Sequence, residues 1–84
     1  MAKNTPIGKV VHWYDKIGVA VIKLAGGLKV GDSVRVAHGD KEFTETIASI
    51  ELDHAPVKSG KSGEEIAVKL SEKAGEGSLV YLAE

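Results

Sequence analysis

One segment of the chain carries residue types that bind phosphate in other proteins. The run 55–62 ends in Gly60-Lys61-Ser62, which satisfies a relaxed form of the phosphate-loop pattern. A working loop of this kind leads directly into a helix, whose N-terminus and backbone amides hold the phosphates. Here Pro56 removes one amide, and the residues that follow are acidic and then alternate like a strand. The segment therefore predicts a hairpin loop, with no bound GTP or ATP and no other cofactor.

Histidine and serine side chains offer no assembled site in the sequence. The chain contains no cysteine, and its three histidines, at positions 12, 38 and 54, are far apart. A zinc site needs ligands that converge, and no two of these histidines have ligand spacing on one element. Asp53-His54 invites a hydrolase interpretation, but nothing resembles the sharp turn that exposes a serine nucleophile. We therefore expect no metal site and no enzymatic activity.

The aromatic cluster His12-Trp13-Tyr14 lies between two lysines. Aromatic rings interleaved with lysines can stack on bases while the lysines meet phosphates. Residues 1–35 carry six basic side chains against two acidic ones, whereas residues 36–84 carry five against ten. The nucleic-acid-binding residues predicted from this pattern are Lys9, Trp13, Lys16, Lys23 and Arg35. Two alternatives stay open: folding interleaves the two halves so that the asymmetry averages away, or Trp13 belongs to the core or anchors a dimer.

Glycines and prolines divide the chain into short runs rich in valine and isoleucine, a pattern typical of an all-β sandwich or barrel. The sequence predicts strands over residues 7–14, 17–24, 33–37, 43–52, 65–70 and 79–82. The second run is apolar on both faces, which predicts a central strand or a strand with a second contact surface.

Alternation within the runs predicts which side chains face the core, because successive residues of a strand point to opposite sides. In the first strand, Val10, His12 and Tyr14 share a face, and we expect Tyr14 to be buried there. Asp15-Lys16 is short enough for a two-residue hairpin turn into the second strand.

Length and composition limit the fold to one small domain. The chain has 84 residues, of which 43% are apolar and 27% are charged. It is too short for a complete P-loop GTPase, a Rossmann enzyme or a TIM barrel. No run approaches the ~20 apolar residues of a membrane span, and no signal peptide is evident. We expect a flexible tail over residues 1–6 and one domain over residues 7–84, in a cytoplasmic protein that is a monomer or a weak homodimer. Because closure removes free edges, the expected fold is a small closed six-stranded antiparallel barrel.

Several segments, in order, resemble the second domain of translational GTPases such as elongation factor Tu. They are Gly8-Lys9-Val10 and residues 17–24, 28–34, 62–68 and 75–81. The resemblance covers residues 7–82 and is closer still to small stand-alone translation elongation factor-like proteins; similar barrels occur at the end of some U32 peptidases. Its most specific piece is Val30-Gly31-Asp32, where a positive φ at Gly31 and a turn capped by Asp32 are expected.

The resemblance implies the six-stranded barrel and a site for RNA. In elongation factor Tu this barrel helps to hold the aminoacylated end of tRNA, and the matching edge here is Glu51, Asp53 and His54. His54 stands where the family has an arginine, and Lys69 replaces an apolar residue. The implied function is a non-enzymatic binding module that contacts RNA or a translation protein. The alternatives are a protein-interaction or scaffold barrel that self-associates, and an accessory domain that serves a peptidase in trans.

Overall fold

The computed structural model describes residues 6–53 and 55–83, whose regular elements are all β-strands. The ten strands are β1 (Gly8–Tyr14), β2 (Val19–Leu24), β3 (Leu28–Lys29), β4 (Ser33–His38), β5 (Lys41–Thr46), β6 (Ile50–Leu52), β7 (Ala55–Val57), β8 (Ser59–Gly60), β9 (Glu65–Lys69) and β10 (Leu79–Leu82). Eight of them form one sheet in the order β5-β4-β10-β1-β2-β9-β6-β7, and β3 pairs with β8. All the pairings are antiparallel, so the prediction of an all-β antiparallel domain is confirmed.

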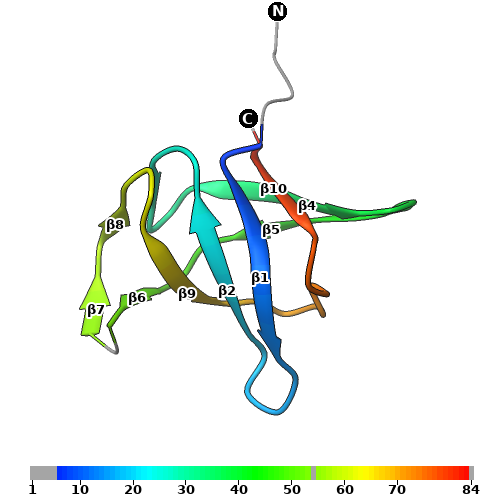
Figure 1. Cartoon of the computed structure of the whole chain (residues 1–84), viewed down its shortest axis with the longest axis horizontal. Coiled ribbons are helices and arrows are strands. Elements are labelled where there is room, and N and C mark those ends of the chain that lie inside the picture. Colours follow the sequence, from blue (N-terminus) through cyan, green and yellow to red (C-terminus); the bar gives the residue numbers. More distant parts are fainter. Residues whose placement is uncertain (1–5, 54, 84) are drawn as a thin grey trace, which may run out of the picture.

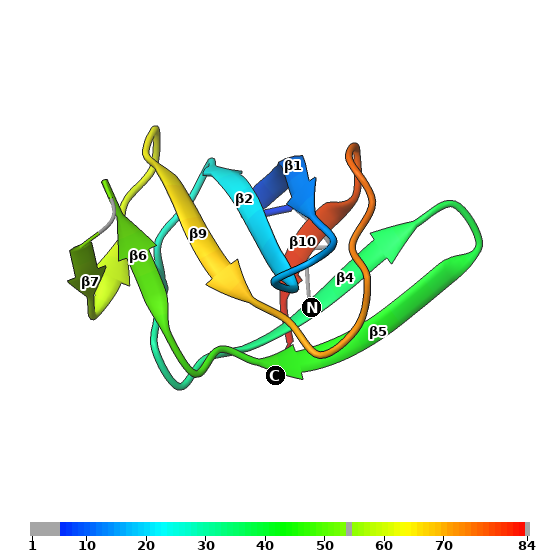
Figure 2. The ribbon, with the colours of Figure 1, turned by 90° about the horizontal axis from the view of Figure 1, so that it is seen from below.

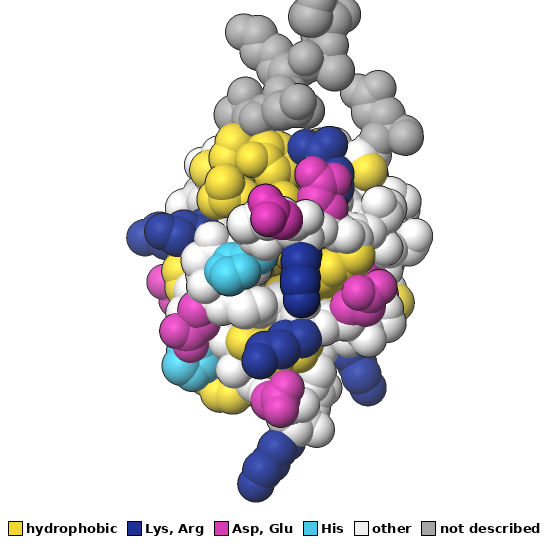
Figure 3. Space-filling view, turned by 90° about the vertical axis from the view of Figure 1, so that its right-hand side faces the viewer, with side chains coloured by type: hydrophobic (Ala, Val, Ile, Leu, Met, Phe, Trp, Pro, Cys, Tyr) yellow, Lys and Arg dark blue, Asp and Glu magenta, His cyan; other side chains and the backbone are white. Residues whose placement is uncertain are grey.

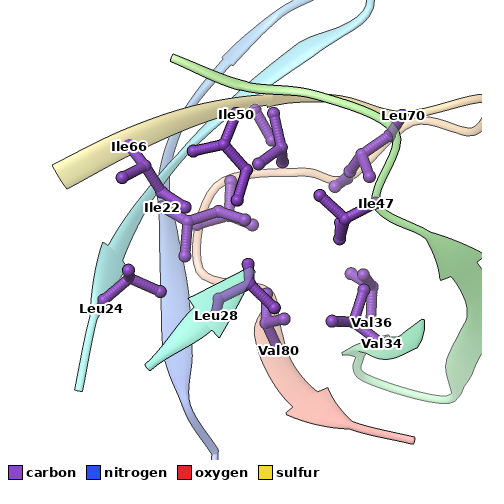
Figure 4. Packing of buried hydrophobic residues seen from close by; sticks show 14 residues of the cluster. Ile22, Leu24, Leu28, Val34, Val36, Ile47, Ile50, Ile66, Leu70 and Val80 are labelled. Carbon is purple, nitrogen blue, oxygen red and sulfur yellow. The ribbon is translucent and has the colours of Figure 1, made fainter. Parts of the chain in front are cut away.

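The large sheet curls around one hydrophobic core (Figures 1 and 2). Each long strand contributes alternate residues to it, as Ile66 and Val68 of β9 do. Figure 4 shows side chains from opposite parts of the curled sheet pointing toward one another. The largest fully buried apolar side chains are Val10, Ile22, Leu28, Val34, Val36, Ile47, Ile50, Ile66, Val68 and Val80.

The predicted closed six-stranded barrel is not found. The sheet ends at β5 on one side and at β7 on the other, and no ladder joins them in the described part of the chain. The predicted strand 43–52 divides, because β5 pairs with β4 whereas β6 pairs with β9. At this break Ile47 is buried, and its backbone exchanges hydrogen bonds with Gly31 and Asp32. These bonds extend the pairing with the β4 side by one residue, and the chain then leaves that ladder through residues 48 and 49 to reach β6.

β1 contains a bulge that reverses which side chains face the core. Its pairing with β2 shifts between Val10 and His12, so that Val11 is an extra residue. An extra residue changes the phase of alternation along the rest of the strand. As a result Trp13 packs against the core, whereas Tyr14 is 46% exposed. The prediction that Tyr14 is buried is therefore wrong.

The turn between β1 and β2 is longer than the predicted two residues. The amide of Gly18 donates to the carbonyl of Tyr14 at 2.9 Å, which closes a loop over residues 15–18. β2 therefore begins at Val19, and Ile17 lies in the loop, where it is 60% exposed.

Two broader expectations concern the ends of the chain and membranes. The predicted tail, residues 1–6, lies almost entirely outside the described residues and stays a prediction. Ile7, next to it, is held to the sheet because its amide donates a hydrogen bond to the carbonyl of Val80 at 2.7 Å.

Within residues 6–53 and 55–83, no helix is long and apolar enough to cross a membrane.

The turn at Val30-Gly31-Asp32 has the predicted geometry. Gly31 has a φ of 96°, a conformation that side chains with a Cβ rarely adopt. The carboxylate of Asp32 accepts a hydrogen bond from the amide of Lys29 at 3.0 Å. Both the positive φ and the aspartate cap are thus confirmed.

Replacing Gly31 with valine should lower the free energy of unfolding by about 1–3 kcal/mol. The cause is backbone strain alone, because no atom lies within 4 Å of where a Cβ would stand. Urea denaturation measures the change, and Gly31→Asn should recover part of it because asparagine tolerates positive φ better. Equal stability of wild type and Gly31→Val would mean that the turn does not need this conformation.

Candidate functional site

The residues predicted to form a basic face are only partly brought together. Lys9 on β1 and Lys23 on β2 lie directly opposite each other in the sheet. Lys16 lies in the loop at the far end of the same hairpin. Arg35 lies on β4, which is separated from β1 by β10. The structure therefore groups two of the four basic side chains and separates the other two.

Arg35 is engaged within the domain. Its guanidinium stacks over the ring of Tyr81, 4.6 Å from the centroid. Its Nε lies 3.9 Å from a carboxylate oxygen of Glu42. Because a ring and a carboxylate already lie beside this guanidinium, its attraction for a phosphate is weakened.

Trp13 is not a free stacking surface. The bulge turns its ring toward the core, where it is half-buried and packs against the hydrophobic cluster. Its indole Nε1 donates a hydrogen bond to Asp15 at 3.1 Å. The interpretation of Trp13 as part of the core, which the sequence left open, is the one that the contacts support.

The edge matched to the translation factors forms an acidic hollow. Glu51 and Asp53 line a space of about 260 Å³, together with Glu65, Val21 and Ala67. Asp53 has a φ of 55°, which fits its position in the turn between β6 and β7. His54 lies outside the described residues. Since three carboxylates line this hollow, it repels phosphate.

A larger groove is lined by residues that were not predicted to form a site. It has a volume of about 750 Å³ and separates the β4–β5 hairpin from the loop between β9 and β10. Val36 and Phe43 form its apolar part, and charged side chains of both signs line it, namely Asp40, Lys41, Glu42, Glu72 and Lys73. Figure 3 shows charged side chains of both signs interspersed over one face of the molecule, with the largest group of hydrophobic side chains at one end and smaller ones between the charges. In the sequence the borders of this groove are visible only as two polar segments, 38–41 and 71–77, that connect predicted strands.

The Gly60-Lys61-Ser62 segment is part of a turn between two strands. Gly60 belongs to β8, and β9 rather than a helix follows the turn. The amide of Lys61 is already satisfied, because it donates to the carboxylate of Glu64 at 2.8 Å. The segment is a turn, as predicted, but it is not a hairpin loop, because β8 pairs with β3 whereas β9 pairs with β2 and β6. The absence of nucleotide binding stays a prediction.

No catalytic constellation forms among the residues with described positions. They contain no group of three or more histidine, aspartate or glutamate side chains arranged to hold a metal ion. His12 lies 3.3 Å from a carboxylate oxygen of Glu76, and the hydroxyls of Ser71 and Ser78 donate to Glu45 and to a backbone carbonyl. These serines therefore serve loop structure, and neither contacts a histidine in these bonds.

The β1–β2 hairpin exposes apolar side chains on its outer side. Three of the five large hydrophobic side chains that are exposed in the described residues belong to it. Tyr14 lies opposite Val19, and half-buried Val21 follows on the same side of β2. We call this surface the hairpin face; it consists of Val11, Tyr14, Ile17, Val19 and Val21. Figure 1 shows the hairpin extending beyond the neighbouring strands.

Known proteins similar to this chain are named as proteases. No family model matches the chain. An uncharacterized protease of Methanocaldococcus jannaschii is 38% identical to it over 81 residues, which cover 95% of this chain. The chain spans about a fifth of that relative, since the match covers 20% of its length. The similarity thus relates the chain to one part of a longer protein.

Two solved structures with the same fold are of a peptidase-related domain. The C-terminal domain of a Geobacillus thermoleovorans protein described as a U32 peptidase has a TM-score of 0.88 over 100% of both chains, at 14% identity. Its selenomethionine variant has a TM-score of 0.85, covers 92% of this chain and 98% of that one, and is 15% identical. At this level of identity the similarity shows a shared fold.

These relatives overturn the assignment to translation factors. The predicted elongation factor-like identity and translation-associated RNA-binding function are wrong, because a relative is named as a protease and the matching domains come from a protein described as a U32 peptidase. The motifs misled for a physical reason. A positive φ at Gly31 and the cap by Asp32 are requirements of a turn in this fold, and a fold hosts many functions.

Proposed function

We propose that this chain is an accessory domain, without catalytic activity of its own, that binds a protein carrying a U32-type peptidase domain. The observation that carries the proposal is the 38% identity to a fifth of a protein named as a protease. A segment that matches almost all of this chain and so little of the relative behaves as one module of a larger protein. The peptidase chemistry then belongs to the remainder of such a protein.

The chemistry of the side chains supports a binding role. The sequence has no cysteine nucleophile, and the described residues hold no cluster of metal ligands. The two serine hydroxyls whose bonds stabilise the loop between β9 and β10 face a carboxylate and a carbonyl. A serine nucleophile needs a base that takes its proton, and neither of these partners is a histidine.

The proposal is tested by identifying what the chain binds. The tagged chain is added to extract of the organism that encodes it, cross-linked, and the captured proteins are identified by mass spectrometry. We expect a protein with a U32-type peptidase domain, captured equally with and without RNase. The purified chain alone should hydrolyse neither casein nor gelatin.

The matched control is the Geobacillus thermoleovorans domain, which has the same fold at 14% identity and should capture the peptidase less well. Cleavage of casein by the purified chain would contradict the proposal. So would a set of captured proteins that contains no U32-type peptidase domain.

A further inference from the structure

We infer that the hairpin face is the surface that binds the peptidase-bearing protein, and that it fits a partner surface with an apolar centre and a carboxylate facing Lys9 and Lys23. The inference rests on the proposed function and specifies where and by what chemistry the contact forms. Val11, Tyr14 and Ile17 are 39%, 46% and 60% exposed. Together with the half-buried valines of β2 they form an apolar surface on the outside of a sheet whose inside is already filled by the core.

An apolar surface of this type signals an interaction site. Exposed hydrophobic side chains are ordinary when they are scattered, and informative when they are contiguous. Here the antiparallel register makes them contiguous, because Tyr14 lies opposite Val19, and Val21 lies opposite His12. The rings of His12 and Tyr14 extend the surface, since their centroids lie 4.6 Å apart.

The charges beside the hairpin face indicate carboxylates on the partner. Lys9 and Lys23 lie directly opposite each other on β1 and β2 and both are exposed. Like charges in this position destabilise a sheet. Neither lysine forms an ion pair in the described residues, although Glu65 lies opposite Lys23 on β9. A partner carboxylate between the two lysines would relieve their repulsion, so a carboxylate is the complementary group at this end of the face. At Val21, where the face adjoins the acidic hollow, the complementary group is basic.

Two observations favour a peptidase domain over a nucleic acid. The hollow of Glu51, Asp53 and Glu65 adjoins the face at Val21 and repels a phosphate backbone. In the relative, the segment that matches this chain belongs to a longer protein that is named as a protease.

Site-specific photo-cross-linking tests the inference. One sample carries p-benzoylphenylalanine in place of Ile17 on the hairpin face, and a matched sample carries it in place of Thr44, which is exposed on β5. Each purified chain is irradiated in extract of its own organism, and the cross-linked products are identified. We expect the probe at Ile17 to cross-link to the U32-type peptidase domain and the probe at Thr44 not to do so.

The other outcomes separate this inference from the proposed function. Cross-linking to the peptidase domain from Thr44 alone overturns the hairpin face and leaves the proposed function standing. No peptidase domain at either position overturns both. If the probe at Ile17 cross-links to a second copy of the chain or to RNA, the inferred identity of the partner is overturned.

Binding measurements decide the case in which both probes react. Ile17→Asp and Lys23→Glu should each weaken binding to the captured peptidase by about tenfold or more, and the loss for Lys23→Glu should shrink at high salt. Val30→Asp is the matched control, because Val30 is an exposed aliphatic residue, 39% exposed like Val11, that lies outside the hairpin. Circular dichroism must show the folded spectrum for all three. Unchanged affinity of Ile17→Asp overturns the inference.

Discussion

Replacing Ile22 with alanine is expected to lower the free energy of unfolding by about 2–5 kcal/mol. Ile22 is 1% exposed and lies on β2, which pairs with β1 on one side and with β9 on the other. Figure 4 shows it among Ile66, Ile50 and Leu28, so that truncation leaves a space that several strands would have to close. Small domains have only ~5–15 kcal/mol of stability in total, so much of it is lost. Urea denaturation followed by circular dichroism measures the change.

Ile17→Ala provides the control with the same chemical change on the surface. Ile17 is 60% exposed in the loop between β1 and β2, and its truncation should alter the stability by less than about 0.5 kcal/mol. A similar loss for both variants would mean that the hairpin loop packs more tightly than its exposure indicates. A small loss for Ile22→Ala would mean that the core relaxes around the deleted atoms.

Adding one methyl group at Gly60 should cost about 1–3 kcal/mol through overpacking. Gly60 is buried in β8, and a Cβ there would stand 2.6 Å from Cδ1 of Leu24 and 3.0 Å from Cγ2 of Ile66. Both neighbours belong to the core and can yield only by displacing other side chains. Thermal unfolding of Gly60→Ala measures the loss.

Gly27→Ala is the matched control for this effect. The nearest atom to a Cβ at Gly27 is the carbonyl oxygen of Gly60, at 3.8 Å, which is an ordinary contact. Its stability should therefore stay within about 0.5 kcal/mol of the wild type. Equal stability of Gly60→Ala and wild type would show that this glycine is not required for packing.

The strands could be predicted from the sequence better than their connections. Turn residues and alternation locate β2, β4, β9 and β10 within a few residues, because those strands are regular and half-buried. The break at residues 47–49 could not be predicted. Ile47 is apolar and β-branched like a strand residue, and its hydrogen bonds with Gly31 and Asp32 continue the pairing with the β4 side. The break is made by the change of partner from β4 to β9, and β9 is distant from β6 in the sequence.

The orientation of Trp13 and Tyr14 was unpredictable for a related reason. Strict alternation places Tyr14 with Val10, but the bulge at Val11 shifts the phase by one residue. No glycine or proline marks the bulge, so the sequence contains no local signal for it. Bulges are set by the pairing with a neighbouring strand, and here that neighbour is β2.

The candidate site, too, could be predicted from the sequence only in part. The apolar character of both faces of β2 was visible in the sequence and underlies the hairpin face. The pairing of Lys9 with Lys23 depends on register, which alternation alone does not fix. The Val30-Gly31-Asp32 motif correctly predicts a turn, but the conformation that this turn requires carries no information about RNA binding.

The pairing of the first long strand with the last one governs when this domain can fold. β1 lies between β2 and β10, and Gly8 opposes Val80 across the β1–β10 ladder. A hairpin of β1 and β2 can form as soon as both have been synthesised, but the other edge of β1 stays open until β10 has left the ribosome. Folding that depends on such distant pairing is slow, and the nascent chain exposes a free strand edge meanwhile. The domain therefore completes its sheet only after β10 has been synthesised, and until then the open edge of β1 is available for pairing with other chains.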